Sequence, residues 1–312
     1  MPVSTVNSPE IEQKVNRLSA AAGRKTVEPD TAVPGSVGPG QLLPDELLTI
    51  AGLNLDLSPA QRATLSREEI ASITQAGIRF EAVLEAGFAA QIATAADLTD
   101  PRITFILHEI GEETRHQRLF QRLLTQLKPQ AKSPVSFRLV RLGYRAVIEA
   151  TIGQKAFFYV LVLAGEEIPD LFQKLASEHP ETDPFIKDVN RYHRMEEARH
   201  LSFARAALPE IWETATVVDR ALVRYVAPAL IGFMFNSMVH PGVYEVIGLP
   251  GFSTWRAASR SSSRQQQRFA STRPILRVLC DAGALPAHAV PAGWRRLCGV
   301  LRDGEPADPV SS

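Results

Sequence analysis

Cysteine is scarce in this chain of 312 residues, which contains only Cys280 and Cys298. Two cysteines are too few for a disulfide framework or a thiolate metal cage, and they are typical of a reducing compartment. The first ten residues, MPVSTVNSPE, lack the charged start and apolar core of a secretory signal. We therefore expect a cytoplasmic protein.

Long apolar runs and an excess of one charge are missing as well. The longest apolar run, Ala156 to Gly165, has about ten residues, whereas a membrane-spanning helix needs about twenty. We expect a buried helix there and no membrane span. With 34 basic and 34 acidic residues the net charge is zero, so we expect no nucleic-acid partner. The arginine- and serine-rich segment 255–264 is expected to be a solvated linker.

No segment shows the alternating pattern of a half-buried strand between hairpin turns. The sequence also contains no Gly-rich phosphate loop, no Ser/His/Asp order and no flavin or nicotinamide fingerprint. A redox enzyme with this sequence would therefore need a separate electron donor, of the reductase or ferredoxin type.

Helical signals, in contrast, run through most of the chain. Caps, prolines and apolar periodicity predict six helices, over residues 66–94, 101–127, 136–167, 184–208, 215–239 and 263–282. Ser66 is predicted to cap the first helix, Pro169 to break or kink the third, and Pro228 to interrupt the fifth. A short loop near residues 97–100 joins the first two of these helices, and a longer turn through His179-Pro180 joins the third and fourth. The two helical hairpins predict an all-α fold: a ferritin-like four-helix bundle with additional C-terminal helices.

The predicted domain organisation is simple. Residues 41–300 should form a single helical domain, with the bundle at about 65–208. Residues 1–40, rich in Pro, Gly, Ser, Thr and Val, are expected to be a flexible or loosely draped arm. Residues 301–312 are expected to be a disordered tail.

A Glu-Glu-x-Arg-His motif occurs twice, once on the second predicted helix and once on the fourth, with an offset of 84 residues. Residues i and i+3 lie on one face of a helix. Glu113 with His116, and Glu197 with His200, can therefore point at one common centre inside the bundle.

Each predicted hairpin also carries a glutamate on its first helix, at Glu81 and Glu166. Glu166 directly follows the longest apolar run, where a carboxylate needs a partner or a metal to be tolerated. Four carboxylates and two imidazoles can neutralise two metal ions, with two carboxylates free to bridge. Oxygen and nitrogen donors without thiolate suit iron, with manganese as the alternative. This is the ligand pattern of ferritin-like di-iron proteins.

His193 breaks the symmetry between the two halves, because its counterpart in the first half is Glu109. It lies on the same stripe as the second motif, so it is predicted to give one metal an extra nitrogen donor. Glu112 and Glu196 are candidates to accept the histidine N–H groups across the bundle, with an exposed carboxylate as an equal alternative. The arginines of both motifs are expected to form ion pairs.

Other polar residues are expected to be structural. Tyr144, Tyr159 and Tyr192 could store a radical, but tyrosines in a bundle usually pack, and we expect packing here. His240 belongs to a predicted helix stop and is expected to be structural.

The ligand set resembles that of the AurF-type di-iron N-oxygenases, the p-aminobenzoate N-oxygenase family. The resemblance covers about residues 65–240, and its most specific feature is the extra histidine on the last ligand helix. It implies that seven residues bind two iron ions: Glu81, Glu113, His116, Glu166, His193, Glu197 and His200. Where the family usually has aspartate before the two bridging-type glutamates, this chain has Glu112 and Glu196.

The resemblance also implies an activity. Members of that family reduce both irons, bind O₂ and insert oxygen into the nitrogen of an arylamine. The expected function is thus that of an O₂-activating monooxygenase acting on a small organic molecule. The residues leave three alternatives open: C–H hydroxylation or desaturation, ferritin-like metal storage without catalysis, and a metal-free scaffold. A homodimer is also left open, and no residue identifies the substrate.

Overall fold

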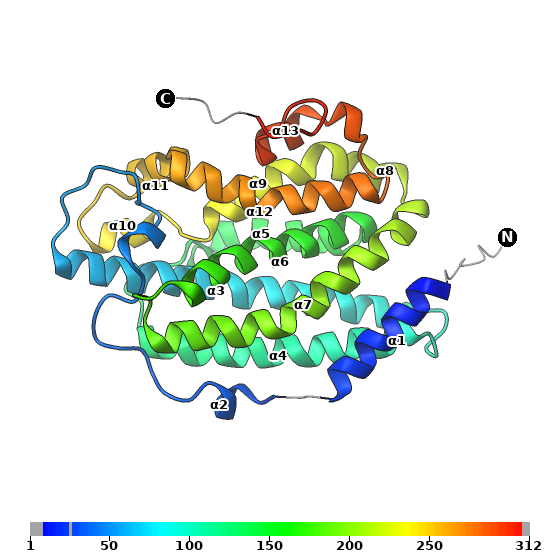
Figure 1. Cartoon of the computed structure of the whole chain (residues 1–312), viewed down its shortest axis with the longest axis horizontal. Coiled ribbons are helices and arrows are strands. Elements are labelled where there is room, and N and C mark those ends of the chain that lie inside the picture. Colours follow the sequence, from blue (N-terminus) through cyan, green and yellow to red (C-terminus); the bar gives the residue numbers. More distant parts are fainter. Residues whose placement is uncertain (1–8, 25–26, 308–312) are drawn as a thin grey trace.

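The chain folds into a layered assembly of helices (Figure 1). The computed structural model describes residues 9–24 and 27–307, and within them it contains no β-strand, only one isolated bridge between Val300 and Pro306. The prediction of an all-α fold is confirmed.

Four long helices form the bundle: α3 (Pro59–Ala93), α4 (Pro101–Leu127), α6 (Lys155–Glu178) and α7 (Pro184–Glu213). The most extensive helix–helix contacts are between α3 and α4 and between α6 and α7. These are the two hairpins that the sequence predicted. Figure 1 shows the four helices running side by side below the C-terminal layer.

The N-terminal caps explain where the bundle helices begin. Asp100 caps α4 by accepting from the Arg102 N–H, as predicted. The predicted cap at Ser66 is wrong, because α3 already begins after Ser58, which forms a capping box with Gln61. Ser66 lies inside α3, where its buried hydroxyl accepts the Leu42 N–H at 3.0 Å.

The third predicted helix is in fact two helices. α5 (Arg138–Ile152) ends at Gly153, and α6 then starts in a direction that differs by 116°. Pro169 does not break α6, and α7 likewise continues through Pro209. A proline inside a helix removes one hydrogen bond and crowds the preceding turn. Burial of the apolar faces of these helices outweighs that local cost.

The N-terminal segment contains more structure than the draped arm that we expected. α1 (Pro9–Arg24) packs against α4 and α7, and its Val15 is only 1 % exposed. Short turns follow at α2 (Pro29–Ala32) and η1 (Asp45–Leu47). At the other end, residues 301–307 form turns. The rest of the expected arm and tail, residues 1–8, 25–26 and 308–312, lies outside the described residues.

The C-terminal third forms a second helical layer on the bundle. Its elements are α8 (Val217–Ala221), the π-helical turn η3 (Leu222–Val226), α9 (Ala227–Ser237), α10 (Gly242–Val246), α11 (Gly251–Arg260), α12 (Ser262–Asp281), η4 (Ala287–Ala289) and α13 (Ala292–Cys298). The short 3-10 helix η2 (Pro134–Ser136) is not part of this layer and precedes α5. The expected linker at 255–264 is wrong, because α11 and α12 meet at Ser261, whose side chain caps α12. Arg264 there is buried, with its guanidinium over the rings of Phe172 and Phe235.

One helical stretch of the described chain, residues 217–246, is long and apolar enough to cross a membrane. The bent pair α5–α6 would be a second such stretch if its two helices were counted as one span. Part of the first stretch lies inside the protein, since Val223, Ala227, Ile231 and Phe235 are at most 1 % exposed. Core helices of large helical domains share this composition.

Candidate metal centre

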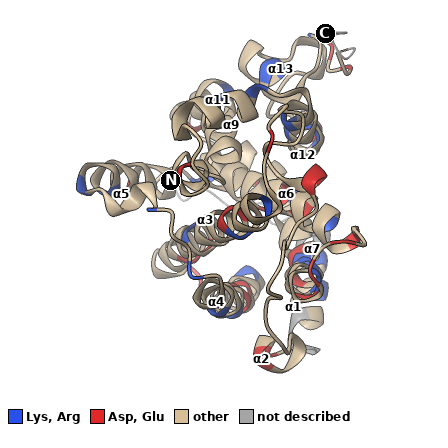
Figure 2. Cartoon of the chain, turned by 90° about the vertical axis from the view of Figure 1, so that its left-hand side faces the viewer, with Lys and Arg blue, Asp and Glu red and all other residues tan. Residues whose placement is uncertain are grey.

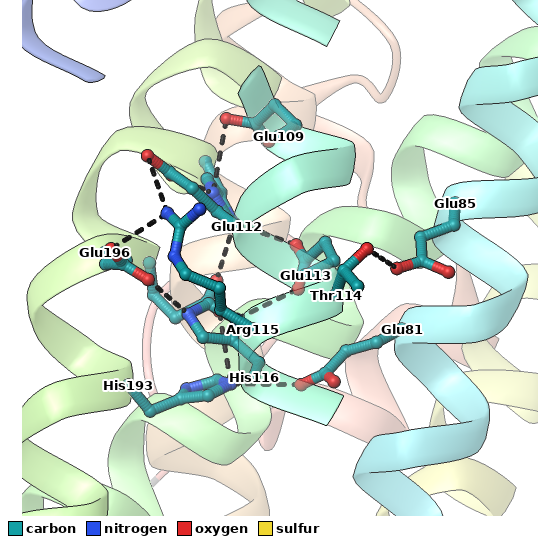
Figure 3. A network of polar contacts seen from close by, with 12 residues as sticks. Glu81, Glu85, Glu109, Glu112, Glu113, Thr114, Arg115, His116, His193 and Glu196 are labelled. Atoms are coloured by element: carbon teal, nitrogen blue, oxygen red, sulfur yellow. Dashed lines mark hydrogen bonds and ion pairs between the residues drawn. The ribbon is translucent and has the colours of Figure 1, made fainter. Parts of the chain in front are cut away.

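The seven residues that the sequence singled out converge in the interior of the bundle. They come from all four helices: Glu81 from α3, Glu113 and His116 from α4, Glu166 from α6, and His193, Glu197 and His200 from α7. Each is at most 4 % exposed. Figure 3 shows Glu81, Glu113, His116 and His193 directed toward one another from three helices.

The donor atoms fall into two adjacent groups. Glu81, His116 and His193 form the first group, and Glu113, Glu166, Glu197 and His200 form the second. In each group, every residue offers one donor atom, and these donor atoms all lie within 4.8 Å of one another. Each group is therefore compact enough to surround one ion.

Glu113 joins the two groups. Its Oε2 lies 3.0 Å from His116 Nδ1 in the first group, and its Oε1 lies 2.9 Å from His200 Nδ1 in the second.

Glu197 does the same from the opposite helix. Its Oε1 lies 3.2 Å from His193 Nε2 and 3.3 Å from His116 Nδ1, whereas its Oε2 lies 3.2 Å from His200 Nδ1. Two carboxylates thus have one oxygen on each side, which is the arrangement of bridging ligands.

The histidines of the two motifs are held by glutamates of the facing helix. Nε2 of His116 lies 2.9 Å from Glu196 Oε2, and Nε2 of His200 lies 2.9 Å from Glu112 Oε2. When Nε2 carries the proton and donates it to the carboxylate, the Nδ1 lone pair is free to face the centre.

Each of these glutamates also meets an arginine. Arg115 Nη2 lies 3.3 Å from Glu196 Oε1, and Arg199 Nη2 donates to Glu112 Oε1 at 2.7 Å. Burial opposes ionisation of Glu112, but His200 and Arg199 outweigh it and hold the pKa of that carboxyl below its usual value. The sequence predicted the ion pairs but did not identify which carboxylate each arginine would meet.

His193 faces the centre through the other ring nitrogen. Its Nε2 lies 3.1 Å from Glu81 Oε1, while its Nδ1 lies 3.0 Å from Gln173 Oε1 and its ring stacks on Phe120. Burial lowers the pKa of His193 to about 4, so the neutral imidazole keeps a lone pair at Nε2. Sequence reasoning missed Gln173. Its place two turns after Glu166 on α6 was the available signal.

Three other polar residues that the sequence analysis considered, Glu109, Tyr159 and Tyr192, are not among the seven predicted ligands. Glu109 is buried, with Oε1 3.4 Å from His200 Nε2, and burial raises its pKa. The Tyr159 hydroxyl donates to Gln91 Oε1 at 3.2 Å, and the Tyr192 hydroxyl donates to the Val27 carbonyl at 2.6 Å.

Two more residues are remote from the donor groups. Tyr144 is on α5 and 38 % exposed. His240 is buried, and its backbone N–H donates to Ser72 Oγ.

The chemistry of the donor set fits two cations. Several inward atoms are buried without a hydrogen-bond partner within the described chain: Glu81 Oε2, Glu113 Oε1, both carboxylate oxygens of Glu197, and His200 Nδ1. Burial and the neighbouring carboxylates also raise the pKa values of Glu81 and Glu166 well above the usual value. Such a concentration of buried acid needs positive charge, and oxygen and nitrogen donors suit iron or manganese.

Comparison with known proteins gives the same assignment of family. Residues 9–283 match the family model described as P-aminobenzoate N-oxygenase AurF. The chain is also 28 % identical over 172 residues to uncharacterized proteins of Mycobacterium bovis and Mycobacterium tuberculosis; this covers 55 % of this chain and 50 % of each relative. The chain thus matches about half the length of these curated relatives. Because the family model covers most of the sequence, the chain belongs to the p-aminobenzoate N-oxygenase AurF family, a ferritin-like di-iron family of oxygenases.

Proposed function

We propose that this protein is an O₂-activating di-iron monooxygenase that oxygenates the nitrogen of a small arylamine. The observation that carries the proposal is the pair of donor groups joined by Glu113 and Glu197. Seven residues would hold two iron ions: Glu81, Glu113, His116, Glu166, His193, Glu197 and His200. Manganese is the alternative metal, and electrons would come from a separate donor protein.

When bound, the iron pair supplies the redox and Lewis-acid chemistry that O₂ reduction needs. The chain's own residues set the conditions for it. Glu112 and Glu196 keep the histidines of the two motifs in one tautomer, and Gln173 does so for His193. The buried residues of α6, from Ala156 to Ile168, exclude water from one side of the centre.

The test of this function is oxygen transfer itself. Protein loaded anaerobically with two equivalents of Fe(II) and mixed with ¹⁸O₂ and p-aminobenzoate should give an N-oxygenated product carrying ¹⁸O by mass spectrometry. A ring- or alkyl-hydroxylated product would favour the C–H alternative. Uptake of iron far beyond two ions per chain, in a large shell by size-exclusion chromatography, would favour storage.

Removal of a histidine partner should weaken metal binding without unfolding the chain. Glu196→Ala leaves the proton on His116 Nε2 without its acceptor and leaves Arg115 without one of its carboxylates. Loss of such partners typically costs about 10- to 100-fold in metal affinity, and we expect that range here. Competitive chelator titration measures it. Glu213→Ala, an exposed change at the end of α7, is the control and should retain wild-type affinity.

We also propose that the protein forms a homodimer through α5. Figure 2 shows α5 extending away from the other helices. Its apolar side chains are open to solvent: Leu139 is 83 % exposed, Leu142 54 % and Val147 49 %. Exposed apolar surface of this kind typically marks an interface. The polar residues form one narrow stripe, in which Arg138 and Glu149 lie near opposite ends of the helix.

A second copy fits that face because α5 is self-complementary. A two-fold axis across the middle of the helix would bring each Arg138 toward the partner's Glu149, and the small Gly143 and Ala146 would allow close approach. Leu142→Arg should therefore convert a dimer to a monomer in light scattering, whereas Arg141→Gln on the polar stripe should not. A monomeric wild-type protein that cosediments with lipid vesicles would contradict the proposal.

A further inference from the structure

Charge is distributed very unevenly along this neutral chain. Residues 251–300 contain eight arginines, no lysine and a single acidic residue, Asp281. The rest of the chain therefore carries a compensating negative charge of seven. The α11–α13 layer is thus the basic part of the molecule, and Figure 2 shows the colour of basic residues on α12 and α13.

The arginines of this layer form no ion pairs with carboxylates of the described residues. Most arginines of the bundle helices form ion pairs, as Arg102 does with Glu210 and Arg194 with Asp170. In the chain as described, from 9 to 24 and from 27 to 307, no arginine after position 250 makes an ion pair. An unpaired basic surface projects its field into solvent and attracts acidic partners.

Four of these arginines form a compact group between α12 and α13, which we call the arginine cluster: Arg268, Arg273, Arg295 and Arg296. The guanidinium groups of Arg268 and Arg273 lie 5.2 and 5.7 Å from the ring centre of Phe269. Arg295 and Arg296 line a hollow of about 360 Å³ together with the same phenylalanine.

The two helices of the cluster are fixed to one another. Arg273 donates through Nε to the carbonyl oxygen of Cys298 and through Nη2 to that of Gly299, at 3.0 and 2.9 Å. The Nε atoms of Arg268 and Arg295 are buried without a hydrogen-bond partner in the described chain. Arg273 thus holds α12 to α13, and Arg295 and Arg296 line a hollow beside Phe269 that can receive an acidic side chain.

The layer also lies next to the candidate metal centre. α12 packs directly on α6, and Arg264 of α12 lies 4.7 Å from the ring centre of Phe172 on α6. The next residue, Gln173, contacts His193 at 3.0 Å. A protein bound on α12 and α13 would thus be one helix away from the residues around the metals.

We propose that the arginine cluster is the docking site of the electron donor, an acidic iron–sulfur protein of the ferredoxin class. This inference rests on the proposed function. Two reduced donor molecules would each deliver one electron, so that two Fe(III) ions become two Fe(II) ions and two oxidised donors leave. Arginines interleaved with an aromatic ring are typical of protein interfaces. The hollow of about 360 Å³ has room for a carboxylate side chain.

The experiment uses a plant-type [2Fe–2S] ferredoxin as the probe, kept reduced by NADPH and its reductase. Anaerobic reduction of the iron-loaded protein is followed by stopped-flow absorbance. We expect the second-order rate constant of reduction to fall at least about tenfold when the salt concentration is raised from about 20 to about 300 mM. The cluster variant is Arg277→Glu/Arg296→Glu, which changes two exposed arginines: Arg296 of the cluster, and Arg277, one helical turn after Arg273 on α12. It should slow ferredoxin-driven reduction at least about tenfold at low salt.

The control variant is Arg62→Glu/Arg191→Glu, which makes the same change in net charge on α3 and α7, away from the cluster. It should be reduced by ferredoxin at a rate close to that of the wild type. Dithionite with a small mediator should reduce the wild type and both variants equally.

Four outcomes separate the inference from the proposed function. If two irons bind and dithionite reduces them, but ferredoxin reduces the cluster variant and the control equally fast, the docking site is wrong. Calorimetric titration with oxidised ferredoxin tests docking without any redox step, and wild-type binding by the cluster variant would also overturn it. Tighter binding of a DNA or RNA oligonucleotide to the cluster than of ferredoxin would assign the surface to nucleic acid instead. Failure to bind two metals would overturn the proposed function.

Discussion

Replacing Glu197 by alanine should abolish the binding of both metal ions, and any oxygenase activity with it. The side chain is shared between the two donor groups: Oε1 lies 3.2 Å from His193 Nε2, and Oε2 lies 3.2 Å from His200 Nδ1. Its loss removes a ligand and a negative charge from both groups at once. Because loss of an indirect partner alone costs about 10- to 100-fold, we expect this change to weaken affinity by more than about 1000-fold.

Metal analysis after anaerobic iron loading and desalting measures this effect. Glu85→Ala is the matched control, because Glu85 lies one turn after Glu81 on α3 but belongs to neither donor group and accepts a hydrogen bond from the Thr114 hydroxyl at 3.1 Å. The control should retain two ions per chain. Burial opposes ionisation of Glu197, but His200 and His193 outweigh it and hold the pKa of that carboxyl well below its usual value. The metal-free Glu197→Ala protein should therefore remain helical by circular dichroism but be less resistant to urea than the metal-free wild type at neutral pH. Two tightly bound ions in Glu197→Ala would contradict the bridging role.

The convergence of the seven site residues was predictable because the information is local. An i, i+3 spacing places Glu113 and His116 on one helical face wherever the helix lies. The same spacing occurs again in the second hairpin, and each hairpin has a glutamate on its first helix. These residues meet at one centre as soon as the two hairpins face each other. The loop near residues 97–100 and the longer turn through His179-Pro180 predicted those hairpins, and the structure contains them.

Helix boundaries were less predictable because several signals compete. Ser58 and Ser66 both precede helical sequence, and only burial decides that Ser66 lies inside α3. Pro169 is unfavourable locally, but α6 buries the apolar run that precedes it, from Ala156 to Ile168, and tertiary packing outweighs a local preference. The break at Gly153 carried no strong signal of its own.

The contacts around the donor residues could not be predicted, because they depend on how helices face one another. Which ring nitrogen of His193 points inward follows from the position of Gln173 on α6. The burial of Arg264 between Phe172 and Phe235 likewise requires α12 to lie on α6. A neutral total charge also concealed the basic C-terminal layer, since the sum says nothing about distribution.

Gly165→Ala should destabilise the protein and weaken metal binding, although it adds only one methyl group. A Cβ at this position would lie 1.8 Å from Cζ and 2.1 Å from Cε2 of Phe80, so the half-buried ring must move. Phe80 precedes Glu81 and Gly165 precedes Glu166, so the contact fixes α3 against α6 directly beside two candidate ligands. Overpacking of this kind costs about 1–3 kcal/mol of unfolding free energy.

Urea unfolding measures the stability loss, and chelator titration measures the weaker metal binding. Gly111→Ala is the control, because a Cβ there would meet only Arg115 Nη1, at 3.9 Å. Since alanine favours a helix over glycine, that change should be neutral or stabilise by about 0.5–1 kcal/mol. The double change Phe80→Ala/Gly165→Ala should be less destabilised than the sum of the single changes, because the clash is absent without the ring. Strictly additive effects would show that the Phe80 ring does not determine how closely α3 and α6 approach.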